Sequence, residues 1–291
     1  MSAEIVISGV TKNYKGCVAV NNVSMTLQGP VIYGLIGKNG AGKTTLLKMI
    51  SGLAAPSAGK IECTAPNGIG SLIEAPGVFG HLSARDNIII KMKLTGRTDH
   101  ERADALLKLV GLSNSAQRRA GTFSLGMKQR LGIAMALIDD PDILLLDEPI
   151  NGLDPEGIVL VRDLLLSLKR ENKIIIVSSH MLEELSKVSD RYGILEGGSL
   201  IKEFTAKELE TGFEDAYSVI VSDKEKALAA LSELGIEAFV SEQYVLIHSD
   251  EEKACFAVYK LYEYGVRVRE FKKHGTTLER ILLSKGGDLN A

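Results

Sequence analysis

Apolar positions along the first two thirds of the chain alternate between unbroken runs and stripes at helical spacing. The run at 143–146 is entirely aliphatic, which predicts a strand buried on both faces of a parallel sheet. Over residues 102–110 the apolar side chains recur at helical spacing and stop before Gly111, which indicates a helix. Alternating strands and helices of this kind predict an α/β fold with a mostly parallel sheet.

The beginning of the chain has a different pattern. The β-branched runs at 4–10 and 18–28, split by a turn at residues 15–16, predict antiparallel strands beside the main sheet. Several further elements are predicted along the chain: strands at 60–63, 67–73 and 173–177, helices at 156–168 and 181–188, and a hairpin over 192–204.

A helical subdomain is predicted at about 75–140. Ser83 and Thr98 are each followed, three residues later, by an acidic residue, which is the spacing of a helix N-terminal cap. Ser124 has the same capping character at the start of another helix. A capping serine needs no functional explanation by itself.

From about residue 217 strands and helices follow in the order β-α-β-β-α-β, which predicts a small two-layer α+β domain. We therefore divide the chain into a large domain at 1–210 and a small one at 211–291. The expected elements are strands at 217–221, 237–240, 244–248 and 267–272, helices at 223–234 and 251–264, and a closing helix at 277–283 capped by Thr277.

The glycine-rich stretch Gly37 to Thr45 lies between an apolar run and a helical pattern. In this context the motif predicts a phosphate cradle, because glycines turn backbone N–H groups inward and a helix N-terminus attracts anions. We expect Lys43 to reach the β- and γ-phosphates of a nucleoside triphosphate and Thr44 to bind Mg²⁺. The expected phosphate-binding residues are Gly37, Asn39, Gly40, Ala41, Gly42, Lys43, Thr44 and Thr45. An ordinary glycine turn is the competing interpretation.

Asp147 and Glu148 follow the buried strand at 143–146, where open α/β sheets bind ligands. Asp147 is then suited to hold Mg²⁺ beside Thr44. Glu148 remains free to orient or deprotonate the attacking water. The two carboxylates predict catalysis rather than binding alone.

Two further residues have an ordinary and a functional interpretation. His180 follows the strand at 173–177 and is either a surface histidine or a group that reaches a γ-phosphate. Tyr14 is either a surface tyrosine or an aromatic face stacked on adenine. Spacing alone leaves both alternatives open for Tyr14.

Composition restricts the classes of partner. The 291 residues are 45% hydrophobic and 24% charged, with a net charge of −3 that gives no reason to expect nucleic acid. Three distant cysteines predict reduced thiols of a cytosolic protein. No secretion signal is recognisable, and no apolar run approaches the ~20 residues of a membrane helix. Any membrane role therefore requires a partner.

Taken together, the motifs over residues 5–207 resemble the nucleotide-binding subunit of an ABC transporter. The matching positions are Tyr14 for the adenine-stacking aromatic residue, Gly37 to Thr45 for the Walker A loop, Ser124-Leu125-Gly126-Met127 for the signature sequence, Asp147 and Glu148 for the Walker B aspartate and catalytic glutamate, Asp154 for the D-loop, and His180 for the switch histidine. The resemblance implies an ATPase that uses ATP and Mg²⁺.

The resemblance also implies partners. Two copies would pair head to tail, so that Ser124 and Gly126 of one copy meet the γ-phosphate held by Lys43 of the other. A separate transmembrane permease would hold the chain at the cytoplasmic face of the membrane, with a coupling helix docked near Glu74 and the helices at 83–111. The small C-terminal domain would be a structural cap, a regulatory module or an aid to pairing.

Two positions depart from the usual family pattern. Leu125, Gly126 and Met127 replace Gly-Gly-Gln of the signature, and Glu74 replaces the Q-loop glutamine, a metal-site residue. This combination resembles the bacterial subgroup that exports bacitracin or confers immunity to lantibiotic peptides. The carboxylate of Glu74 either retunes the coupling of hydrolysis to the permease or is a neutral variation.

Two other classes of function compete with transport. A non-transport ABC ATPase acting on the ribosome or on DNA would usually carry a second cassette or a long coiled coil, and the sequence has neither. A P-loop kinase or GTPase would lack the signature-like segment at Ser124 and the histidine at His180. The sequence therefore favours the ATPase subunit of an exporter of antibiotics or other drugs.

Overall fold

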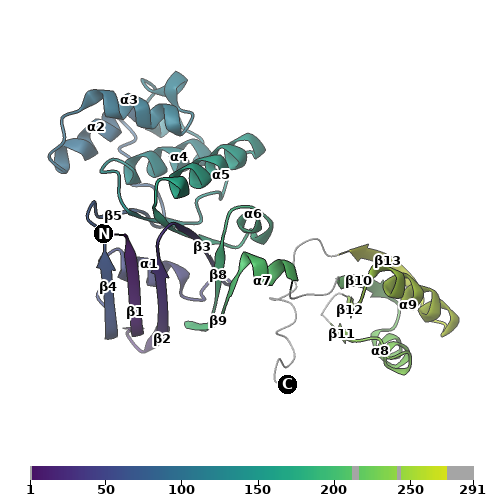
Figure 1. Cartoon of the computed structure of the whole chain (residues 1–291). Coiled ribbons are helices and arrows are strands. Elements are labelled where there is room, and N and C mark those ends of the chain that lie inside the picture. Colours follow the sequence, from purple (N-terminus) through teal and green to yellow (C-terminus); the bar gives the residue numbers. More distant parts are fainter. Residues whose placement is uncertain (1, 212–215, 241–243, 274–291) are drawn as a thin grey trace. The chain divides into compact units, whose positions relative to one another are not determined.

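The structure is a computed structural model that describes residues 2–211, 216–240 and 244–273 (Figure 1). The chain divides into two compact units, residues 1–206 and 207–291. The predicted helix at 277–283 lies outside the described residues. Among the described residues, no helix combines the length and apolarity that crossing a bilayer requires.

The first unit is built on a six-stranded sheet with the order β5-β6-β7-β3-β8-β9, in which only β9 is antiparallel to its neighbour. The strands are β3 Val31–Ile36, β5 Ile69–Leu72, β6 Ile143–Asp147, β7 Ile174–Ser179, β8 Arg191–Glu196 and β9 Ser199–Thr205. Every residue of β3, β6 and β7 is buried, which confirms the predicted mostly parallel sheet. Because these three strands are neighbours, the segments that follow them meet at one edge.

A second, three-stranded antiparallel sheet has the order β2-β1-β4, with β1 Glu4–Tyr14, β2 Cys17–Gln28 and β4 Ala58–Thr64. The turn between β1 and β2 uses two left-handed residues, Lys15 and Gly16. Alternate residues of β1, such as Ile5 and Ile7, enter a core shared with β3 and with helix α1 Lys43–Ile50. The antiparallel sheet thereby supports the helix that follows the glycine-rich loop.

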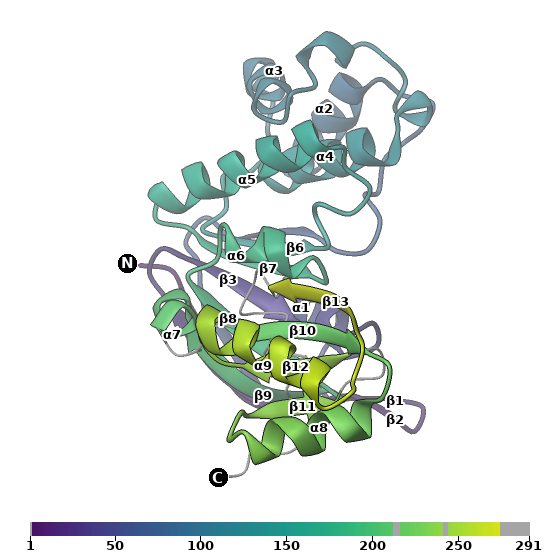
Figure 2. The same cartoon turned by 90° about the vertical axis from the view of Figure 1, so that its right-hand side faces the viewer.

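Helices form the other end of this unit. Figure 1 shows α2 and α3 on the side away from β1, β2 and β4, and Figure 2 shows the same for β1 and β2. The further helices of this unit are α2 Ala84–Leu94, α3 His100–Leu109, α4 Leu125–Ala136, α5 Pro155–Arg170 and α6 Leu182–Ser186, with short 3₁₀ turns at Ser113–Ser115 and Ala120–Thr122. The helix α7 Ala206–Thr211 begins at the last residue of this unit and continues into the second. The helix α7 was not predicted, and α6 is shorter than predicted.

One of the three caps predicted in the helical subdomain is wrong. Ser83 caps α2 by accepting a hydrogen bond from the N–H of Asp86, as predicted. At α3, however, Asp99 rather than Thr98 accepts from the first free N–H groups. A carboxylate is a stronger acceptor than a hydroxyl, so the helix begins one residue later than Thr98 would place it.

The second unit is a four-stranded antiparallel sheet with the order β11-β12-β10-β13. Its elements are β10 Ala216–Val221, α8 Lys224–Glu233, β11 Ala238–Val240, β12 Val245–His248, α9 Glu251–Glu263 and β13 Val268–Lys273. Both helices lie on one face of the sheet (Figure 2), around a core that includes Val219, Leu231 and Leu261. This is the predicted two-layer arrangement.

Candidate functional site

Gly42 turns the chain from the glycine-rich loop into α1. Its φ is 104°, and a β-carbon there would lie 2.3 Å from the carbonyl oxygen of Ala19, so only glycine fits. The first turn of α1 therefore begins directly at a pocket of about 220 Å³, which the loop lines together with Asp147 and Glu148. Free N–H groups at a helix start make this pocket suited to an anion.

Lys43 is the cation of this pocket. Only 6% of the residue is exposed, and its Nζ donates to the carbonyl oxygen of Gly37 at 2.7 Å. The same Nζ lies 3.8 Å from Oε1 of Glu148. The lysine thus closes the loop onto itself and brings its charge to the place where phosphate oxygens would lie.

Thr44 and Asp147 are held together although they are 103 residues apart in the chain. The hydroxyl of Thr44 donates to Oδ2 of Asp147 at 2.8 Å. A hydroxyl and a carboxylate oxygen are the hard ligands that Mg²⁺ prefers. Among the described residues, no three His, Cys, Asp or Glu side chains are grouped so as to hold a metal ion. Thr44 and Asp147 offer two oxygen ligands side by side. The residues present therefore fit Mg²⁺.

Glu148 and His180 face each other at the mouth of the pocket. The Nδ1 atom of His180 lies 2.7 Å from Oε2 of Glu148, while Oε1 of the same carboxylate faces Lys43. Glu148 is 23% exposed and His180 53% exposed. The carboxylate is thus positioned between two nitrogen groups and open to water, as a general base requires.

Comparison with known proteins decides the family. Residues 20–151 match the family model for the ABC transporter. The bacitracin transport ATP-binding protein BcrA of Bacillus licheniformis is 36% identical over 299 residues, which cover 98% of this chain and 94% of that protein. The chain belongs to the ABC transporter family. It is an ATP-binding subunit, and its reaction is the hydrolysis of ATP.

Other relatives agree with this assignment. The lantibiotic transport ATP-binding protein SrtF of Streptococcus pyogenes is 40% identical over 211 residues, covering 69% of this ABC subunit and 92% of that protein. A dimeric ATP-binding cassette solved in a post-hydrolysis state with ADP and Pi has a TM-score of 0.64 and 24% identity, covering 69% of this chain and 98% of its own. That structure shows the shared fold.

Ser124, Gly126 and Asp154 of this ABC subunit lie outside the described lining of the nucleotide pocket. Ser124 caps α4 by accepting from the N–H of Met127 at 3.2 Å, and Asp154 caps α5 by accepting from Gly157 at 3.0 Å. A β-carbon on Gly126 would lie 3.0 Å from the carbonyl oxygen of Gly152, so the signature segment packs tightly on the D-loop of the same chain.

Glu74 and Tyr14 also lie outside the described lining of that pocket. Glu74 has a left-handed φ of 63°, and its Oε1 accepts a hydrogen bond from Nζ of Lys48 at 2.5 Å. This hydrogen bond raises the pKa of Lys48. Tyr14 ends β1 with 46% of its surface exposed, and Nζ of Lys12 lies 5.0 Å from its ring centre. The charge of Asp147 also raises the pKa of Lys48, so the ion pair of Glu74 lies within electrostatic reach of Asp147.

The sequence did not single out two residues that hydrogen-bond to Asp147 or to the backbone of Glu148. Ser178 bonds to both Asp147 and Glu148, and the side chain of Gln129 donates to the carbonyl oxygen of Glu148. A signal for Ser178 exists in the sequence, because it is the first polar residue after the apolar run of β7. In the parallel register it lies directly beside Asp147. No local pattern marks Gln129.

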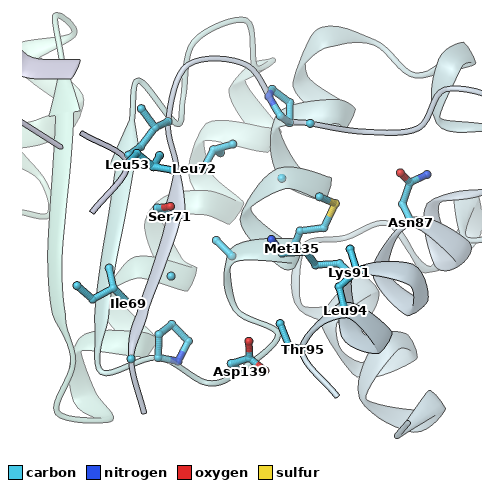
Figure 3. Close-up of a pocket in the computed structure, with 18 of the residues that line it drawn as sticks. Leu53, Ile69, Ser71, Leu72, Asn87, Lys91, Leu94, Thr95, Met135 and Asp139 are labelled. Atoms are coloured by element: carbon cyan, nitrogen blue, oxygen red, sulfur yellow. The ribbon is translucent and has the colours of Figure 1, made fainter. Parts of the chain in front are cut away.

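A larger groove of about 630 Å³ lies between the sheet and the helices of this ABC subunit. Figure 3 shows Ile69 and Leu72 of β5 on one side of the groove, Lys91 and Leu94 of α2 on the other, and Met135 of α4 between them. Leu94 is 78% exposed at its rim. The groove is an accessible surface outside the nucleotide pocket, lined by apolar side chains and by polar ones such as Asn87 and Asp139.

Proposed function

We propose that this ABC subunit powers the export of peptide antibiotics through a separate membrane permease. The observation that carries the proposal is the similarity to a bacitracin transport ATP-binding protein along 98% of this chain. The lantibiotic transport relative and the glutamate at position 74 support the same class of cargo. A role on the ribosome or on DNA has no comparable support.

Binding of ATP follows from the loop and from Lys43. The N–H groups of Gly42 to Thr45 and the buried ammonium group of Lys43 would bind the phosphates. Thr44 and Asp147 would hold Mg²⁺, which neutralises phosphate charge when it is bound. Tyr14 offers an exposed ring for adenine. Glu74 would join the metal site through its second carboxylate oxygen, since Oε1 pairs with Lys48.

Hydrolysis requires a water in line with the γ-phosphate and a group that takes its proton. Glu148 is the acceptor in our proposal, since its carboxylate is partly exposed at the mouth of the pocket. His180, within 2.7 Å of that carboxylate, would orient it and contribute a donor toward the developing charge. Lys43 would stabilise the same charge from the loop side.

A second copy of the chain would complete each site. Ser124, Gly126 and Asp154 lie outside the lining of the pocket of their own chain, and Leu125 at the N-terminus of α4 is 58% exposed. Such a helix start suits a phosphate that the other copy holds. A two-fold arrangement would then form two equivalent sites at one interface.

The permease would dock in the groove between β5, α2 and α4. A groove of mixed lining with two exposed leucines, Leu53 and Leu94, suits an amphipathic helix of the partner. Attachment through this groove would hold the chain at the cytoplasmic face of the membrane. Because Glu74 precedes the groove residues Ala75 to Gly77, its ion pair with Lys48 connects the groove to α1.

Expression of this chain with its permease in a sensitive bacterium is expected to raise the bacitracin or lantibiotic concentration that inhibits growth. Leu94→Glu is expected to remove the protection and the co-purification of the two proteins, because a charge at the rim opposes an apolar contact. Leu109→Glu, an exposed leucine of α3 outside the described groove lining, is the matched control. The measurements are inhibitory concentration and yield of the complex.

An unchanged sensitivity to both peptide classes, in cells that contain an assembled and ATP-hydrolysing complex, would contradict the antibiotic cargo and leave the transporter assignment standing. Equal loss of complex in Leu94→Glu and Leu109→Glu would contradict docking in the groove.

A further inference from the structure

Ser178 makes contacts that its position in the chain does not suggest. It lies near the end of β7 and is fully buried. Its hydroxyl donates to Oδ1 of Asp147 at 2.5 Å and accepts from the N–H of Glu148 at 3.0 Å. One hydroxyl group therefore bonds to two consecutive acidic residues of the active site.

The contact with Asp147 gives the second oxygen of that carboxylate a hydrogen-bond partner. Asp147 is 5% exposed, so both of its oxygens need partners within the protein. Thr44 supplies one, at Oδ2, and Ser178 supplies the other, at Oδ1. The orientation of the carboxylate toward the metal position thus depends on a hydrogen bond that comes from the neighbouring strand.

The contact with Glu148 holds a strained backbone. Glu148 has a φ of 50°, a left-handed value that a residue with a side chain rarely adopts unless its surroundings enforce it. Its N–H donates to both the carbonyl and the hydroxyl oxygen of Ser178. Its carbonyl oxygen accepts a hydrogen bond from Nε2 of Gln129 at 3.1 Å. This backbone conformation accompanies a side chain directed to Lys43 and His180.

We propose that Ser178 is a positioning residue that sets the metal-binding and the water-activating carboxylate together. Burial alone does not explain why the hydroxyl group of Ser178 makes two hydrogen bonds, because the hydroxyl groups of two other buried serines make fewer. Ser179 is equally buried and accepts from the N–H of Met181, whereas the buried Oγ of Ser189 has no partner among the described residues. The proposal rests on the ATPase site and the Mg²⁺ ligands proposed above.

The test compares Ser178→Ala with the matched control Ser189→Ala in the full-length protein. ATP affinity is measured by calorimetry in EDTA and again in excess Mg²⁺, and kcat is measured separately. For Ser178→Ala we expect ATP affinity in EDTA within about twofold of wild type, and about a tenfold loss in both the Mg²⁺-dependent gain of affinity and kcat. Ser189→Ala should match wild type in all three.

Ser178→Cys keeps the volume of the side chain but bonds weakly, and it is expected to show the same losses. The inference is overturned if the Mg²⁺-dependent gain and kcat of Ser178→Ala equal those of Ser189→Ala. It is also overturned if both Ser178 variants lose ATP affinity in EDTA by the same factor as the Mg²⁺-dependent gain and also unfold at a lower temperature than wild type. That pattern describes a structural role. A wild-type protein without Mg²⁺-dependent hydrolysis would contradict the proposed site itself.

Discussion

Replacing Glu148 by glutamine is expected to lower the turnover of ATP by about a thousandfold while MgATP still binds. The amide has the size of the carboxylate but cannot accept a proton from water. The change also removes the negative charge that faces Lys43 at 3.8 Å and His180 at 2.7 Å. Binding should persist, because the loop and Lys43 remain in place. We expect the variant to accumulate as an ATP-bound pair of chains.

Steady-state hydrolysis and gel filtration with MgATP measure these two effects. Glu171→Gln is the control, since Glu171 is an exposed carboxylate just after the end of α5, away from the pocket-lining residues. A Glu148→Gln protein that hydrolyses ATP at the rate of Glu171→Gln would exclude Glu148 as the proton acceptor.

Lys43→Ala is expected to weaken MgATP binding by about a hundredfold, or about 3 kcal/mol. The lysine is buried, and its ammonium group both closes the loop at Gly37 and supplies the positive charge of the pocket. Its removal also leaves the carboxylate of Glu148 without its nearest cation, which disfavours an incoming phosphate. Calorimetric titration with MgATP gives the affinity.

Lys38→Ala is the matched control for this experiment. Lys38 belongs to the same loop, but its side chain is exposed and only its backbone carbonyl, which alanine retains, contacts Lys43. Similar affinities of the two variants would remove Lys43 from the phosphate site, whereas a selective loss in Lys43→Ala supports it.

The sequence predicted the parts of the fold and the site that depend on local patterns. The unbroken apolar runs of β3, β6 and β7 identify strands buried on both faces, and such strands end at a common edge. The glycine-rich loop carries its own conformational requirement, as Gly42 shows. Thr44 lies in the first turn of α1, shortly after β3, and Asp147 ends β6. Their contact therefore follows once β3 and β6 are placed in one parallel sheet.

Contacts that depend on register and packing were not accessible from the sequence. Ser178 reaches Asp147 because β6 and β7 pair in one particular register. Gln129 reaches Glu148 only through the packing of α4 on the sheet. The ion pair of Glu74 with Lys48 joins residues 26 positions apart, with the strands β4 and β5 between them, so a pattern of residue types gives no sign of it. The error at Thr98 has a different, local origin, since Thr98 and its neighbour Asp99 are both capping residues and Asp99 caps the helix.

Our proposal that two copies complete each ATP site is tested most directly by mixing two inactive variants. Lys43→Ala leaves Ser124 intact, and Ser124→Arg leaves Lys43 intact, so a mixed pair contains one complete site. We expect each variant alone to be inactive and an equal mixture to recover about a quarter of wild-type hydrolysis, since half of the pairs are mixed and each has one of two sites intact. A mixture as inactive as its components would contradict the shared site.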